Sequence, residues 1–143
     1  MNNISLTALM IPSKEVEVDY PGIDGFKVKL AFQSREELIK LRKKSTNKKW
    51  KGREMIEEVD DQLFLSMYVK AVVRGWTGLK LKNLHRLLLV DLTDKKDLEE
   101  EVLFNEENAL ALMKASAEFD SFVSETVSDL ANFPTSSSPK LVT

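Results

Sequence analysis

The 143-residue sequence contains no cysteine, which excludes a disulfide framework, a thiol nucleophile and a thiolate metal site. It contains a single histidine, His85, so no second position supports a histidine-based metal site or a serine–histidine–aspartate triad. Its few glycines do not form a phosphate-binding loop. We therefore expect no enzyme activity, cofactor, metal ion or small-molecule substrate.

The sequence also lacks a dominant charge and a long hydrophobic run. The 21 Lys and Arg residues nearly balance the 23 Asp and Glu residues, so no overall field favours nucleic acid or an anionic membrane. No stretch reaches the ~18 to 20 apolar residues of a membrane span, and the N-terminus lacks the pattern of a signal peptide. We expect a soluble intracellular protein.

A β-hairpin is the first pattern present. Apolar and charged residues alternate in KEVEVDY and again in FKVKLAF, as expected for strands with one buried face. The intervening PGIDG has the chemistry of a turn. The segment ISLTALMI, residues 4–11, is predicted as a third strand.

Two helices are predicted next. Ser34 and Glu37 form a capping-box pattern at the start of SREELIKLRKK. After the polar loop STNKKWKG, a long helix is predicted from about Arg53 to Val73. An apolar stripe at helical spacing defines its buried face: Met55, Ile56, Val59, Leu63 and Met67, widened by Phe64, Tyr68 and Val72.

The long helix meets the sequence Gly75-Trp76-Thr77-Gly78. Gly75 suits the left-handed residue that follows a helix, and Gly78 suits a second turn before a short helix in LKLKNLHRLLL. Trp76 is then interpreted as an aromatic anchor folded onto the last helical turn. It is also a candidate for partner binding, since tryptophan is enriched at interface hot spots.

The C-terminal part is predicted to be an exposed connection followed by helices. TDKKDLEEEVLF lacks periodicity, Asn105 caps a helix through EENALALMK, and Ser116 caps a second helical segment. The chain is thus predicted to have an α+β fold, with a β-hairpin or small antiparallel sheet followed by a mainly α-helical bundle. Residues 1–133 form one domain, β in 1–32 and helical in 33–133, and residues 134–143 a flexible, disordered tail.

The order of these segments resembles the tail assembly chaperone family of bacteriophages with long, non-contractile tails. The similarity rests on YVKAVVRGWTGL at residues 68–79 and LFNEENALALM at residues 103–113, with Asn132-Phe133 adding a little. It spans about residues 32–133. The leucine-rich stretch between Leu79 and Val102 departs from the family pattern.

The resemblance implies a non-enzymatic protein that binds the tape measure protein, keeps it soluble and promotes assembly of the tail tube around it. It would act in the host bacterial cytoplasm and be absent from the mature virion. Candidate partner-binding residues are Trp76, Leu79, Tyr68, Met67 and Trp50. Met10, Met55, Met67 and Met113 offer adaptable side chains for the same purpose, and the alternative role for each is to fill the core.

The resemblance also implies a longer form, made by a ribosomal frameshift near the end of the gene. Ser138-Pro139-Lys140 permits a slippery heptamer, and the extension would reach the tail tube protein.

Two other functions remain open from sequence. One is a structural tail completion or connector protein of the virion. The other is a small nucleic-acid-binding protein, because residues 40–53 contain eight basic residues and Trp50.

Overall fold

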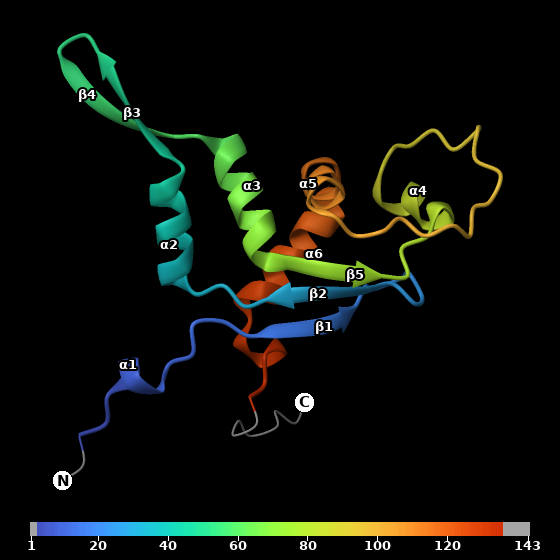
Figure 1. Ribbon diagram of the computed structural model, residues 1–143, viewed down its shortest axis with the longest axis horizontal. Helices are drawn as coiled ribbons and strands as arrows, with labels where there is room; N and C mark the ends of the chain where they lie inside the picture. Colours follow the sequence, from blue (N-terminus) through green and yellow to red (C-terminus); the bar gives the residue numbers. More distant parts are fainter. Residues whose placement is uncertain (1–2, 136–143) are drawn as a thin grey trace.

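The computed structural model describes residues 3–135, and it has the predicted α+β architecture. A three-stranded antiparallel sheet lies at the centre of an elongated molecule (Figure 1). The strands are β1 (Glu15–Asp19), β2 (Lys27–Ala31), β3 (Thr46–Lys51), β4 (Glu54–Val59) and β5 (Val73–Thr77). The helices are α1 (Leu6–Leu9), α2 (Arg35–Lys44), α3 (Asp61–Val72), η1 (Leu81–Asn83), α4 (Leu84–Leu87), α5 (Glu106–Ala115), α6 (Ala117–Ser128) and η2 (Leu130–Asn132).

The central sheet has the strand order β1-β2-β5. The predicted β1–β2 hairpin is confirmed, and its register places Glu17 opposite Lys29 and Asp19 opposite Lys27. The third strand is β5, so the prediction of a strand at residues 4–11 is wrong. That segment contains α1, which buries none of its residues, whereas β5 contributes Val73 and Trp76 to the core.

The predicted helix from Arg53 to Val73 is wrong in its first third. Residues 54–59 instead form β4, which pairs antiparallel with β3 across the two-residue loop Gly52-Arg53. Gly52 has φ +67°, the left-handed geometry that a type II′ hairpin turn needs at its first position. Cross-strand Lys–Glu neighbours favour this pairing over a helical turn. Helix α3 begins later, capped by the Asp60 side chain, which accepts from the Leu63 amide.

Helix α3 passes into β5 with no intervening loop. Val73, which follows the last helical residue, already has an extended backbone, with φ −96° and ψ 106°. Gly75 lies within β5 and does not adopt a positive φ, so the predicted left-handed helix stop at Gly75 is wrong. The pairing of β5 with β2 shifts register at this point, which makes Arg74 the extra residue of a bulge.

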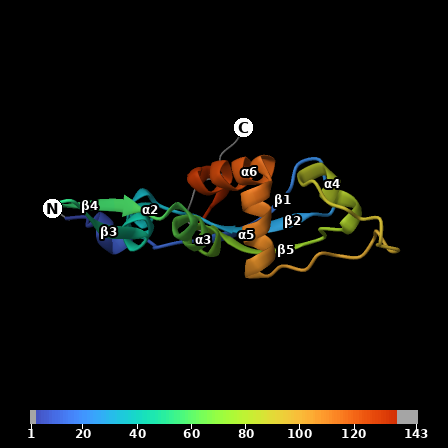
Figure 2. The same ribbon diagram turned by 90° about the horizontal axis from the view of Figure 1, so that it is seen from above.

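The predicted helix caps are confirmed. Ser34 accepts a hydrogen bond from the Glu37 amide, Asn105 from the Asn108 amide and Ser116 from the Phe119 amide. Ser116 thereby separates α5 from α6. Helix α6 covers one face of the central sheet (Figure 2) and buries Phe119, Val123 and Val127, spaced four residues apart.

The predicted division into a β part at 1–32 and a helical part at 33–133 does not hold. Three of the five strands in residues 3–135 follow residue 33, and β5 completes the central sheet. Of the predicted tail, only residues 134 and 135 fall within the described part of the chain, and Ser138 to Lys140 lie outside it. None of the described helices is long and apolar enough to cross a membrane.

Gly78 is predicted to be the glycine least tolerant of substitution. It has φ +80°, and a Cβ there would overlap the carbonyl oxygen of Gly25. Gly78→Ala should cost about 3 kcal/mol or more, because backbone strain adds to a clash that no rotamer relieves. Gly25→Ala is the matched control, with φ +81° but open space around the added Cβ, and should cost about 1 to 2 kcal/mol. If denaturant titrations gave the Gly78→Ala and Gly25→Ala proteins equal free energies of unfolding, the clash predicted at Gly78 would be contradicted.

Candidate partner-binding surface

Trp76 is an anchor inside the protein. Its side chain is only 8% exposed, and its ring makes edge-to-face contacts with Phe26, Phe104 and Phe119 at centroid distances of 6.3, 5.2 and 6.3 Å. Its indole Nε1–H donates to the Val102 carbonyl at 2.8 Å. The anchoring interpretation is confirmed, although the ring sits on the sheet rather than on the last turn of α3. Leu79 is also buried, so neither side chain presents a surface to a partner.

The segment between Leu79 and Val102 folds back on itself beside Trp76. The Leu79 carbonyl accepts from the Val102 amide at 2.7 Å, and the Leu81 amide donates to the Glu100 carbonyl at 2.9 Å. Residues 93–104 are largely an exposed connection, as predicted.

Glu99 holds the outer part of this connection. Lys80 Nζ and Lys82 Nζ lie 2.8 and 2.6 Å from its two carboxylate oxygens. Hydrogen bonds from these two amines lower the pKa of Glu99 to about 2. The Glu99 side chain is exposed, so we expect this pair of ion pairs to position the connection rather than to stabilise the core.

Met67 and Tyr68 are half-buried on α3. The Tyr68 hydroxyl donates to Ser124 Oγ on α6 at 3.4 Å, and burial raises the pKa of this tyrosine. Its ring stacks on Phe64 at 6.0 Å, and the Arg42 guanidinium lies 5.4 Å from the Phe64 centroid. These contacts join α2, α3 and α6, so Tyr68 contributes to the packing of these helices against one another.

A groove of about 610 Å³ opens where α3 and α5 meet the central sheet. Its apolar lining consists of Phe104 and Leu110, which are half-buried, and of Val69, Val73 and Ala109, which are buried. Its rim carries both charges: Lys70 Nζ lies 3.9 Å from Glu106 Oε1, and Arg74 Nε lies 3.0 Å from Glu15 Oε1. An apolar lining with a charged rim is the usual anatomy of a protein interface.

Sequence analysis missed this groove. Its residues come from β1, β2, α3, β5, the connection before α5, and α5, and no single period relates them. The one local signal was the apolar pair Val69 and Val73, which continues a helical stripe to the point where the helix ends. Trp76 affects the groove indirectly, since its ring packs edge-on against Phe104 in the lining.

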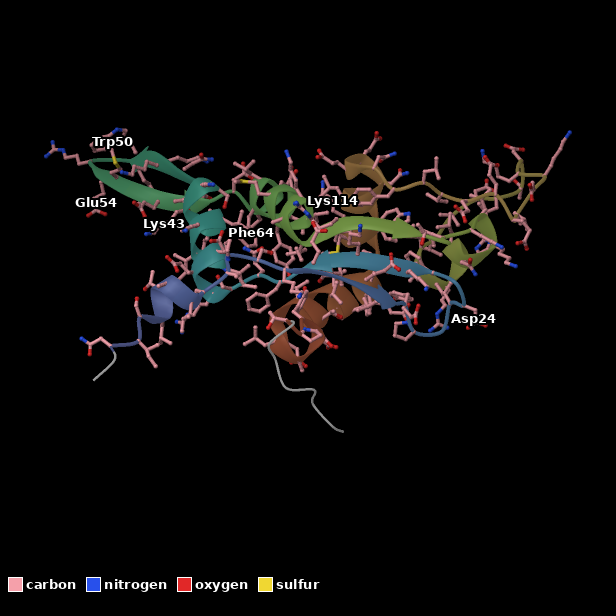
Figure 3. The ribbon with its side chains drawn as sticks, turned by 60° about the horizontal axis from the view of Figure 1, so that its bottom comes forward. Asp24, Lys43, Trp50, Glu54, Phe64 and Lys114 are labelled. Carbon is pink, nitrogen blue, oxygen red and sulfur yellow. The ribbon has the colours of Figure 1, made fainter. Side chains whose placement is uncertain are left out.

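Two further apolar surfaces are exposed. Residues 4–11 leave Ile4, Leu6, Leu9, Met10 and Ile11 mostly in solvent. The second surface is on the hairpin β3–β4, hereafter the arm, which projects beyond α2 and α3 (Figure 3). Trp50 is 70% exposed near its free end, and Met55 lies opposite Trp50 in the register.

The predicted partner-binding residues therefore do not gather at one site. Trp50 is exposed on the arm, Met67 and Tyr68 are half-buried on α3, and the rest are core. The methionines divide similarly: Met10 and Met55 are exposed, Met67 is half-buried, and Met113 is buried in the core.

The basic run at residues 40–53 does not form a basic surface on the arm. β4 places Glu57 opposite Lys48 and Glu54 opposite Lys51, and Lys49 Nζ lies 3.2 Å from Glu58 Oε2. These carboxylates neutralise the lysines that phosphate contacts need, which weakens the nucleic-acid alternative. Among residues 3–135, no three His, Cys, Asp or Glu side chains come together as metal ligands would.

Most of the chain matches a known protein family. The family model described as "YdaY prophage protein" matches residues 29–141, a range that begins within β2 and includes the arm, α3, β5, α5 and α6. No curated protein and no solved structure matches the chain.

The two tryptophans should differ sharply in their contribution to stability. Trp76→Ala should cost ~3 to 5 kcal/mol, because it removes a buried ring and leaves the Val102 carbonyl without its donor. Trp50→Ala is the matched control and should change stability by less than about 0.5 kcal/mol. Chemical denaturation of both variants tests this. A Trp76→Ala protein as stable as the control would show that the ring is not an anchor.

Proposed function

The chain belongs to the YdaY prophage protein family, and from this we propose that it is a tail assembly chaperone that binds the tape measure protein. In this role it keeps the tape measure soluble in the host cytoplasm and promotes tail tube assembly around it. The prophage family supports a phage role, and the resemblance in residues 68–79 and 103–113 supports the chaperone role.

The observation that carries the proposal is the groove between α3 and α5. A tape measure protein is a long helical chain with exposed apolar surface, which aggregates unless it is covered. An amphipathic helix of such a chain can lay its apolar face on Phe104 and Leu110, the two half-buried apolar residues of the lining. The charged rim then orients the bound helix, because Lys70 and Arg74 attract acidic flanks while Glu106 and Glu107 attract basic ones.

The groove also suits binding without large rearrangement. α5 and α3 are each held to the core, through Leu112 and Met113 in one and Val69 and Val72 in the other. The lining is therefore formed before the partner arrives. A preformed surface avoids the entropy cost of ordering and favours binding of many similar helical segments.

Particle composition distinguishes the proposal from a structural tail component. Mass spectrometry of purified virions should detect tail proteins but not this chain. A stoichiometric amount of the chain in purified particles would favour a completion or connector protein.

Groove variants test tape measure binding. Co-expression with overlapping tape measure fragments should raise the solubility of at least one fragment and yield a co-purifying complex. Leu110→Glu should reduce recovery of the complex by ~10-fold or more, since it places a charge on the apolar lining. Ala111→Glu is the matched control, because Ala111 is exposed on the same helix and does not line the groove.

A second groove variant tests the same proposal if Leu110→Glu does not fold. Ser66 is exposed at the groove, and Ser66→Arg should obstruct binding without disturbing the core. Melting temperatures of all variants should be compared beforehand. If no fragment gains solubility, or if folded groove variants bind as well as Ala111→Glu, the proposal is wrong.

A further inference from the structure

The charges of the arm are segregated by strand. β3 carries Lys48, Lys49 and Lys51, whereas β4 carries Glu54, Glu57 and Glu58. The β3 edge of the arm therefore carries the lysines and the β4 edge the glutamates, while each face of the hairpin carries both charges. Figure 3 shows Trp50 and Glu54 near the free end, away from the body of the protein.

Both long edges of the arm are also unpaired in the described part of the chain. β3 and β4 form a sheet of two strands that is separate from the central sheet. A two-stranded ribbon is marginally stable in water, and an open edge is a template for another strand. The arm further exposes Trp50 and Met55, which are cross-strand neighbours and so share one face.

We propose that the arm pairs edge to edge with the arm of a second copy of this chain, β3 of one copy against β4 of the next. The charges of the two strands favour β3–β4 pairing over β3–β3 or β4–β4 pairing. Pairing β3 with β3 would place lysines beside lysines, and pairing β4 with β4 would place glutamates beside glutamates. Only the unlike pairing repeats the Lys–Glu neighbours that already hold the hairpin together.

The pairing has a defined symmetry. When β4 of a second copy lies antiparallel to β3 of the first, both arms point in the same direction. Each copy then offers one basic and one acidic edge, so the contact is head-to-tail and produces a ring if its rotation closes. A closed ring of arms leaves no strand edge free and places every Trp50 and Met55 on the same face of one sheet.

This inference is independent of tape measure binding. The groove lies on the body of the protein, between α3 and α5, and none of its lining residues belongs to the arm. Loss of self-association with retained fragment binding would therefore separate the two proposals.

A charge exchange tests the proposal. In the exchanged variant, Lys48, Lys49 and Lys51 become Glu, while Glu54, Glu57 and Glu58 become Lys. Every cross-strand Lys–Glu pair of the hairpin is conserved with its sign reversed. Light scattering coupled to size exclusion should give wild type and variant the same mass, a multiple of the 16.3 kDa chain.

Mixing the two proteins is the decisive measurement. β3 of the wild type meets lysines on β4 of the variant, so differently tagged wild-type and exchanged chains should not co-purify above background. Two differently tagged wild-type chains should co-purify. A wild type that stays monomeric as its concentration rises overturns the proposal, as does free mixing of the two proteins. An exchanged protein that stays monomeric while the wild type assembles also overturns it.

An arm-less variant keeps the test valid if the exchanged protein does not fold. The two ends of the arm are adjacent, since the Asp60 amide donates to the Ser45 carbonyl at 2.7 Å. Residues 46–59 can therefore be replaced by Gly-Gly, and none of them is buried. The arm-less protein should keep its circular dichroism melting transition and be monomeric. Assembly of this variant to the wild-type mass would place the contact elsewhere and overturn the proposal.

Discussion

The edge-to-face packing of Trp76 is the contact on which the rest of this structure depends. One indole ring touches Phe26, the residue before β2, Phe119 of α6 and Phe104 of the segment before α5. Its single polar atom is satisfied by the Val102 carbonyl, so the ring enters the core without an unpaired donor. A small three-stranded sheet covered by helices on one face has little apolar area of its own. A large ring shared by several elements compensates for this.

The same contact links stability to the candidate binding surface. Phe104 is held on one side by Trp76 and on the other side lines the groove. The packing of Trp76 in the core therefore fixes the position of Phe104 in the groove lining. Trp76 was predicted as an anchor and also as a partner-binding candidate; it is an anchor, and through Phe104 it supports a candidate binding surface.

The sequence predicted those elements whose signals are local. Capping residues such as Ser34, Asn105 and Ser116 indicated helix starts, and strict alternation indicated the first hairpin. The failures share a physical cause. Residues 54–59 have an apolar spacing that also fits a helix. They form a strand because they pair with the lysine-rich strand β3. Gly75 was taken for a helix stop because its role at a bulge depends on β2, a strand far away in the chain. The groove combines residues from six segments, so no local pattern could reveal it.

The direct passage from α3 into β5 determines where this chain tolerates changes in length. Each residue added to a helix rotates the next element by about 100°, and each residue added to a strand exchanges its two faces. With no loop at Val72-Val73 to absorb the change, a single insertion or deletion there would turn the inward face of β5 toward solvent. At the arm the opposite holds, because its ends meet at Ser45 and Asp60 and everything between them lies outside the core. The arm of this chain can therefore be lengthened or shortened by two residues at a time, one on each strand, whereas the junction of α3 with β5 requires a fixed length.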